Sequence, residues 1–258
     1  MPNAPAADAS GASSLLEYAA GTTLGSCREV NEDAFGVFAD LDAFVVVDGC
    51  GGVSSGESAA RLTVECFRRV LREQVTRTGA LLVADPLAVA TFRANTEVFR
   101  EASTHPARRG QGAALCAVRA FEGWITIAHV GDCRVGRQRD GTLVWLTEDH
   151  DLASELRRAG ASRRQQEEVG ELHSTVITRA VGIGEHLPAE VGYHPTLPGD
   201  VYLLCSDGLS RQVEQSRIAA IVSRHSQDLS RCCSALLQAS EDAGGQDSAT
   251  VILLRLRA

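Results

Sequence analysis

Four aspartates stand at the ends of long apolar runs, where they could bind a metal ion. Three runs lead into an aspartate, and the fourth run follows one. If these runs are neighbouring strands, the carboxylates gather at one rim, where they repel each other unless a cation holds them. Hard divalent ions prefer oxygen ligands, so the pattern predicts an oxygen-ligated metal site on a β-scaffold. The aspartates are Asp48, Asp132, Asp207 and Asp247, beside the runs 43–47, 125–130, 201–206 and 249–256.

Such a site is suited to hydrolysis at phosphorus. Two divalent ions that share a carboxylate lower the pKa of a water molecule, which can then attack a phosphate in line. Mg²⁺ or Mn²⁺ fits oxygen ligation, whereas zinc favours His and Cys. Arg28 precedes Glu32 and Asp33 by a few residues, and its planar guanidinium could bind two phosphoryl oxygens. A surface arginine on a loop is the alternative interpretation of Arg28.

A serine hydrolase is the competing enzyme class. Residues 52–56 match the G-x-S-x-G pattern of a nucleophile elbow around Ser54, with His194 or His225 as a possible partner. Two features count against it. Five residues separate Ser54 from Asp48, where the strand ends, and Ser54 with Glu57 has the spacing of a helix capping box.

The seven histidines show no metal-binding spacing. His150-Asp151 resembles the doublet of HD phosphohydrolases, but the other histidines do not support that pattern, and we interpret it as a loop doublet. His129 lies in an apolar run, so we expect a hydrogen-bonded structural histidine.

Antiparallel sheets with flanking helices are the predicted framework. Apolar and helical patterns do not alternate regularly, which disfavours a doubly wound parallel sheet. Residues 149–170 are predicted to form a helix followed by a mobile surface segment. Strands are predicted at 15–25, 33–40, 43–48, 113–120, 124–130, 134–139, 143–146, from 201 and at the C-terminus, and helices from 54 and 85 and at 218–222 and 229–239.

Composition narrows the function classes further. The chain has 258 residues and a net charge of -8, which disfavours nucleic acid as the main partner. It has no lysine, which excludes a Walker-type phosphate loop. Eight cysteines without a CxxC pair indicate a reduced, cytoplasmic protein. Residues 1–14 lack the features of a signal peptide and are predicted to be a flexible tail, and no run is long enough to cross a membrane.

Seven motifs in order resemble the metal-dependent Ser/Thr protein phosphatases of type 2C, particularly the bacterial members. The likeness runs from about Tyr18 to Leu256. Each motif is weak alone, but their shared order is specific. The motifs are Arg28-x-x-Asn31-Glu32-Asp33, Val47-Asp48-Gly49-x-Gly51-Gly52, Val130-Gly131-Asp132-x-Arg134, Leu146-Thr147-x-Asp149-His150, Ile177 to Gly182, Cys205 to Leu209 and Asp247 to Val251.

The resemblance implies a four-layer αββα sandwich over residues 15–258, with a flap at about 149–172. It implies two Mn²⁺ or Mg²⁺ ions per site and single-step hydrolysis of phosphoserine and phosphothreonine. The expected partners are phosphorylated proteins, including a Ser/Thr kinase and its substrates, and the expected state is a monomer. A phosphoprotein-binding module of the same fold, without turnover, is the rival function.

The resemblance also assigns roles to individual residues. Asp48 would bridge the metals, Arg28 would bind phosphate, and Asp132 would hold a third, weaker metal. The remaining assignments are Glu32 and the Gly49 carbonyl for one metal, Asp207 and Asp247 for the other, and Asp33 in support.

Two departures from the family pattern bear on mechanism. Cys50 stands where relatives carry His or Met; a thiol is a weak proton donor, so we expect water to protonate the leaving group. Arg211 stands four residues after Asp207, where an acidic or amide residue is common. A cation there opposes a third metal at Asp132.

Overall fold

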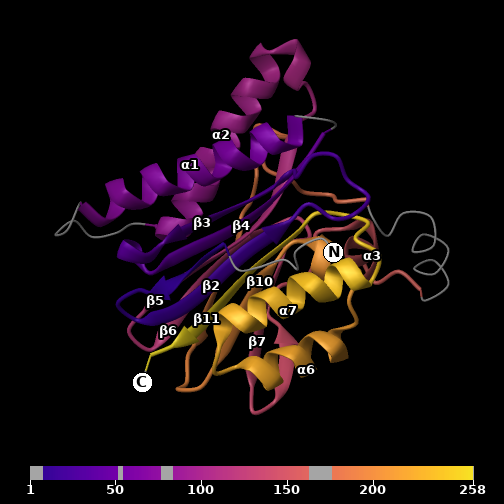
Figure 1. Ribbon diagram of the computed structural model, residues 1–258. Coiled ribbons are helices and arrows are strands. Elements are labelled where there is room, and N and C mark those ends of the chain that lie inside the picture. The colour runs from indigo at the N-terminus through magenta and orange to yellow at the C-terminus, as the bar shows by residue number, and fades with distance from the viewer. Residues whose placement is uncertain (1–7, 52–54, 77–83, 163–175, 258) are drawn as a thin grey trace.

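Two antiparallel sheets stack face to face, and helices cover the outer face of each (Figure 1). The computed structural model describes residues 8–51, 55–76, 84–162 and 176–257. In Figure 1, α1 and α2 lie above the sheets and α6 and α7 lie below them. This arrangement confirms the predicted α+β fold with four αββα layers.

The six-stranded sheet contains the two strands that lead to Asp207 and follow Asp247. Every neighbouring pair in it is antiparallel. Asp140 and Gly141 join strand 134–139 to strand 142–145. Their φ values of 50° and 76° are those that a tight hairpin turn requires. From edge to edge the sheet is β1 (Ala9–Ala12), β2 (Leu16–Thr23), β11 (Ala249–Leu256), β10 (Val201–Cys205), β7 (Arg134–Arg139) and β8 (Thr142–Trp145).

The five-stranded sheet carries Asp33 and Asp48 on paired strands and leads to Asp132. Its strands are also antiparallel throughout. From edge to edge it is β3 (Asp33–Phe38), β4 (Ala43–Cys50), β5 (Gly112–Phe121), β6 (Trp124–Val130) and β9 (Glu190–Pro195).

Helices pack on both outer faces and start where local signals predict. Asp85 caps α2, because its side chain accepts a hydrogen bond from the Leu87 backbone N–H at 2.8 Å. The predicted cap and nucleophile Ser54 lies outside the described residues. The elements are α1 (Ser55–Thr76), α2 (Pro86–Thr104), α3 (Leu152–Arg158), α5 (Asp207–Ser210), α6 (Gln215–His225) and α7 (Leu229–Asp242), with short 3-10 turns at Ala39–Leu41 and Pro106–Arg108.

Burial on both faces explains why the central strands are continuous apolar runs. In β4, Phe44 and Val46 point between the sheets, while Val45 and Val47 pack toward α1 and α2. Strand β10 repeats this alternation, with Tyr202 between the sheets. Three buried clusters result: one between the sheets and one beneath each helical layer.

Two edge strands were not predicted. Residues 9–12 form β1, which pairs with β2, so the predicted flexible tail is wrong for these residues; residues 1–7 lie outside the described part. Strand β9 pairs with β6. Of the predicted flap, the helix α3 is present, and residues 163–175 lie outside the described part.

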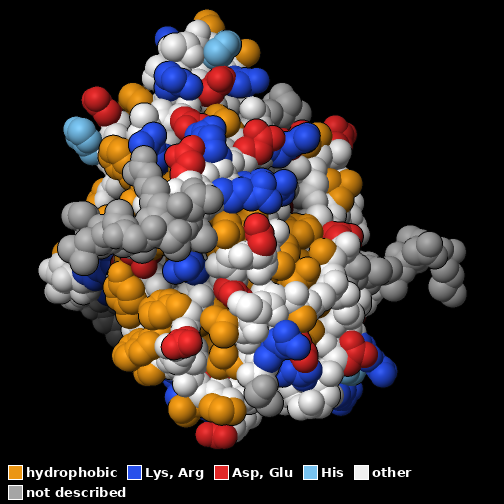
Figure 2. All heavy atoms as spheres, turned by 90° about the vertical axis from the view of Figure 1, so that its left-hand side faces the viewer, with side chains coloured by type: hydrophobic (Ala, Val, Ile, Leu, Met, Phe, Trp, Pro, Cys, Tyr) orange, Lys and Arg blue, Asp and Glu red, His pale blue; other side chains and the backbone are white. Residues whose placement is uncertain are grey.

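On the face shown in Figure 2, arginines and acidic side chains are interspersed, and hydrophobic side chains gather below them. Among the described helices, none combines the length and apolar character needed to cross a bilayer. All eight cysteines are free thiols.

Candidate functional site

The predicted acidic residues converge on one pocket of about 370 Å³. Five separate stretches of chain supply them, from the ends of both sheets. The lining also contains residues 49–51 and Ile177, which follows the predicted flap. Its charged residues are Arg28, Glu32, Asp48, Asp132, Asp207, Arg211 and Asp247.

Strand register places Asp33 beside Asp48. The two residues are direct partners in the β3–β4 ladder. The Gly49 backbone N–H donates to the Glu32 carbonyl at 3.1 Å, which holds the Glu32 segment against the end of β4. A Cβ on Gly49 would overlap the Gly56 carbonyl at the start of α1, so this crossing requires glycine.

A second close crossing brings Asp207 to Asp247. Asp207 begins α5 directly after β10, and Asp247 precedes β11. A Cβ on Gly208 would overlap the Ser248 carbonyl oxygen. Absence of a side chain at Gly208 therefore lets these two segments touch.

Asp33 lies behind the pocket rather than in its wall. Its Oδ2 accepts a hydrogen bond from Ser206 Oγ at 2.7 Å, and Ser206 Oγ in turn accepts from the Thr250 N–H at 3.0 Å. The Asn31 side chain accepts from the Asp33 N–H at 3.0 Å. These contacts join β3, β10 and β11 directly beneath the carboxylates, and sequence patterns did not predict Ser206 or Thr250.

The carboxylates raise one another's pKa. Burial, together with the charges of Asp207 and Asp247, raises the pKa of Asp33 to about 7. Burial and the charge of Asp207 likewise raise the pKa of Asp132 to about 7, against the effect of Arg211. Burial raises the pKa of Asp48 well above its usual range, and four neighbouring aspartates add to this. A cation would reverse these shifts.

Two buried carboxylate oxygens of the pocket lack hydrogen-bond partners among the described residues. They are Glu32 Oε1 and Asp207 Oδ1. Unpaired buried carboxylate oxygens are costly, and they face the pocket from two sides. The all-oxygen donor set and these orphan atoms fit Mn²⁺ or Mg²⁺.

Arg28 lies at the pocket edge, where its side chain is 42% exposed. It forms an ion pair with Asp247 and lies 3.8 Å from Glu32. The guanidinium borders the carboxylates while remaining open to solvent, and its phosphate-binding role stays a prediction.

Cys50 also lines the pocket. Burial, with the charges of Asp132 and Glu32, raises the pKa of its thiol to about 11. The thiol therefore stays protonated and holds its proton tightly at neutral pH. Protonation of the leaving group by water stays a prediction.

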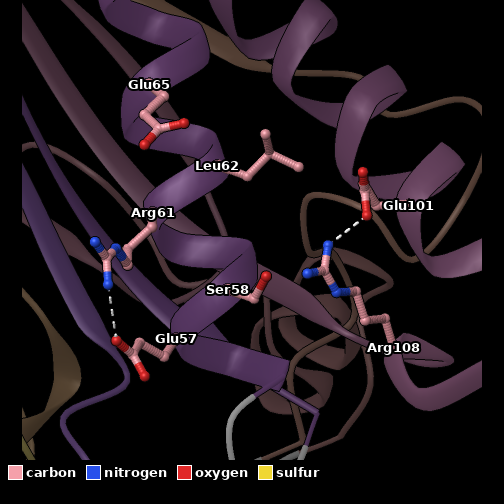
Figure 3. A pocket seen from close by; sticks show the side chains of 7 residues that line it. All are labelled: Glu57, Ser58, Arg61, Leu62, Glu65, Glu101 and Arg108. Atoms are coloured by element: carbon pink, nitrogen blue, oxygen red, sulfur yellow. Dashed lines mark hydrogen bonds and ion pairs between the residues drawn. The ribbon is translucent and has the colours of Figure 1, made fainter. Parts of the chain in front are cut away.

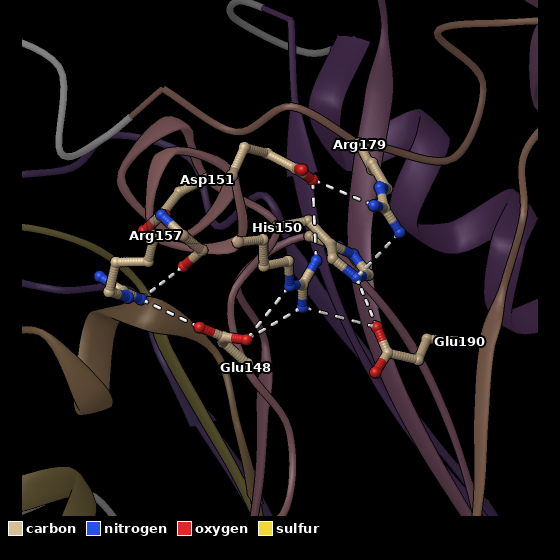
Figure 4. Close-up of polar contacts among 10 residues, drawn as sticks. Glu148, His150, Asp151, Arg157, Arg179 and Glu190 are labelled. Atoms are coloured by element: carbon tan, nitrogen blue, oxygen red, sulfur yellow. Dashed lines mark hydrogen bonds and ion pairs between the residues drawn. The ribbon is translucent and has the colours of Figure 1, made fainter. Parts of the chain in front are cut away.

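His150, at the base of the flap, contacts Glu190 and Arg179 through its ring (Figure 4). It also ties the flap to the Gly131-Asp132 loop. The His150 backbone N–H donates to the Gly131 carbonyl at 2.8 Å, and the Gly131 backbone N–H donates to the His150 ring nitrogen Nδ1 at 3.1 Å. Arg134 binds Asp149 through two contacts of 2.7 Å. His150 lies in the loop between β8 and α3, as expected from the sequence, and its hydrogen bonds make it a structural link.

His129, His150 and Glu190 place three potential ligand atoms within 4.8 Å of one another, a cluster that histidine spacing did not predict. Hydrogen bonding argues against a metal there. Because His150 Nδ1 accepts from Gly131, Nε2 carries the proton and donates to Glu190 at 3.0 Å. Arg179 Nη1 also lies 3.4 Å from Nε2. Within the described part of the chain, neither ring nitrogen of His129 has a hydrogen-bond partner of normal geometry, so the expected hydrogen bond is not seen; the ring packs against that of His150.

A second hollow of about 410 Å³ lies between α1 and α2 (Figure 3). Four of its charged side chains form two ion pairs, Arg61 with Glu57 and Arg108 with Glu101. No buried carboxylate cluster occurs among the described residues that line it, so we assign the chemistry to the acidic pocket.

Comparisons with known proteins agree with this geometry. A family model described as protein phosphatase 2C matches residues 21–248. The serine/threonine phosphatase stp of Listeria monocytogenes is 30% identical over 240 residues, covering 90% of this chain and 93% of the relative. The phosphatase MsPP of Mycobacterium smegmatis, solved with cacodylate, is 31% identical with a TM-score of 0.80 over 95% of this chain and 100% of its own.

A further solved structure bears on the metal. It is the catalytic domain of the phosphatase PstP in complex with 2 manganese ions, 26% identical with a TM-score of 0.80, covering 95% of this chain and 99% of its own. The family model spans 228 of the 258 residues, from the second half of β2 to the residue before β11. The chain belongs to the protein phosphatase 2C family.

Proposed function

We infer that this chain is a metal-dependent protein phosphatase that hydrolyses phosphoserine and phosphothreonine in proteins. The observation that supports this inference most strongly is the convergence of six carboxylates from separate segments. Among them are the buried oxygens of Glu32 and Asp207 that lack hydrogen-bond partners in the described part of the chain. The substrates we propose are the targets of a bacterial Ser/Thr kinase, and the kinase itself.

The chain supplies distinct parts of the mechanism. Bound Mn²⁺ or Mg²⁺ lowers the pKa of water and offsets the phosphate charge. We propose that Asp48 holds both cations from the end of β4, that Glu32 and the Gly49 carbonyl serve one of them, and that Asp207 and Asp247 serve the other. Asp33 fixes the cluster through Ser206.

Arg28 completes the site from the solvent side. Its guanidinium can donate two parallel hydrogen bonds to phosphoryl oxygens, orienting the phosphorus toward the carboxylate cluster. To do so it exchanges its ion pair with Asp247 for the phosphate.

Hydrolysis of p-nitrophenyl phosphate tests the inference. Activity should require Mn²⁺ or Mg²⁺, disappear with EDTA, and fall at least about a hundredfold in Asp207→Asn. Asp242→Asn, on the surface of α7 with half of its side chain exposed, is the matched control and should keep full activity. Activity that survives EDTA or Asp207→Asn contradicts the metal mechanism. A folded, Mn²⁺-binding protein without any turnover supports the rival binding module.

A further inference from the structure

Arg211 places a fixed positive charge inside the acidic pocket. It follows the single turn of α5 and lies four residues after Asp207. Its backbone N–H donates to the Asp207 carbonyl at 2.9 Å, so the helical turn directs both side chains to the same side. The Arg211 position is therefore fixed by the backbone that also presents Asp207.

The guanidinium is bound chiefly by Asp132. Arg211 Nη2 donates to Asp132 Oδ2 at 2.6 Å, and Nε lies 3.5 Å from Asp207 Oδ2. The side chains of Arg211 and Asp132 are 24% and 8% exposed. A charge-assisted contact of this length in a sheltered place is well shielded from solvent, so Asp132 already has a counter-charge.

The charges around the pocket also balance with two divalent cations. Six carboxylates and two guanidinium groups surround it, counting Asp33 behind the wall. Their formal sum is four negative charges, which two divalent ions neutralise. A third divalent ion at Asp132 would have to displace Arg211 or lie beside its positive charge.

We propose that Arg211 takes the place of the third metal ion that the family resemblance assigns to Asp132, so that this phosphatase is complete with two cations. The proposal rests on the proposed function and deepens it. Because a guanidinium neither dissociates nor loses its proton at any working pH, Asp132 keeps its counter-charge whatever the metal concentration.

Calorimetric titration of the metal-free protein with Mn²⁺ tests the proposal. The variants are Arg211→Asp and, as the matched control, Arg217→Asp, which makes the same charge change at a half-exposed arginine paired with Asp242. Wild type and Arg217→Asp should show only the first two binding events. Arg211→Asp should gain a weaker third event, and Asp132→Asn in the Arg211→Asp background should remove it.

A second measurement does not depend on the folding of Arg211→Asp. Asp132→Asn in the wild-type background should leave the number of bound Mn²⁺ ions unchanged, because no ion uses Asp132. If wild type shows a third binding event and Asp132→Asn abolishes it, this proposal is overturned and the proposed function is not. A folded Arg211→Asp that titrates like wild type would also overturn it. Absence of the first two events in wild type would instead overturn the proposed function, and this proposal with it.

Discussion

At the scale of single residues, the site depends on a few charges whose neighbours set their behaviour. Arg28 and Arg211 are both arginines in the same pocket, yet their surroundings differ. Arg28 is 42% exposed at the pocket edge, whereas Arg211 is 24% exposed and bound to the sheltered Asp132. The first is free to exchange partners for a phosphate, and the second is held as an internal counter-ion.

Replacing Arg28 by alanine should weaken substrate binding. Loss of a bidentate charge-assisted contact to phosphate costs about 2–3 kcal/mol, which raises KM for a phosphothreonine peptide by about 30- to 150-fold. Steady-state kinetics at saturating Mn²⁺ measures this. Arg61→Ala, at a 69% exposed arginine on α1, is the control and should leave KM unchanged. An unchanged KM in Arg28→Ala would remove Arg28 from the phosphate site.

His129 should make the folded protein less stable in acid. Burial, with the neighbouring His150 and Arg158 charges, lowers the pKa of His129 to about 3, although Glu190 opposes the shift. The unfolded chain has a histidine pKa of about 6.5. Below about pH 6.5 the unfolded state therefore takes up a proton that the folded state does not, and stability falls as the pH decreases toward 3.

Urea unfolding of wild type and His129→Gln between pH 4 and 8 isolates this contribution. The free energy of unfolding of wild type should fall relative to the variant with a slope approaching about 1.4 kcal/mol per pH unit. Comparing the two proteins cancels the titration of groups that they share. A difference that does not change with pH would show that His129 does not titrate as its burial implies.

At the scale of elements, acidic segments come together where two stretches of backbone cross in close contact at a glycine. Gly208, in the first turn of α5, lies against the backbone of Ser248, which precedes β11. A side chain at this position must push α5 away from that segment. Because Asp207 and Asp247 stand on opposite sides of the crossing, the metal site depends on this contact between elements.

Gly208→Ala should therefore cost stability and metal affinity together. Overpacking of this kind destabilises by about 1–3 kcal/mol or more, and Mn²⁺ titration should show weaker binding at the site of Asp207 and Asp247. Gly184→Ala is the matched control, because a Cβ there would lie 3.7 Å from the nearest atom, His186 O. Equal effects of the two substitutions would refute the crossing argument.

At the scale of the whole molecule, the two sheets meet at a rim of like charges. Asp33 and Asp48 come from the five-stranded sheet, and Asp207 and Asp247 flank strands of the six-stranded sheet. Their repulsion acts across the sandwich when no cation is bound, so metal binding and stability are linked.

Mn²⁺ should raise the thermal midpoint of unfolding. A ligand at one hundred times its Kd stabilises the folded state by about 2.7 kcal/mol, which for a chain of this size is a shift of about 5–10 °C. Scanning calorimetry with Mn²⁺ and with EDTA measures it. The shift should shrink in Asp207→Asn and persist in Asp242→Asn. A thermal midpoint that EDTA does not change would show that no cation is bound between these carboxylates.

Strands were predicted correctly from the sequence where side chains on both faces of the strand are buried. The runs of β4, β10 and β11 are apolar because both faces pack, and their patterns gave the strands directly. β1 and β9 were missed because each is an edge strand with few buried side chains, so neither carries the apolar pattern on which strand prediction relies.

The sequence by itself determined the chemistry: the acidic set, Arg28 and the motif order define a metal-dependent phosphatase of the 2C family. Local patterns carry that information because strand ends and turn glycines are read from neighbouring residues. Only the tertiary structure decided which distant groups touch. The pairing of Arg211 with Asp132, the support of Asp33 by Ser206 and the packing of His129 on His150 join residues far apart in the chain. Strand register and helix packing set those contacts, and no local pattern encodes them.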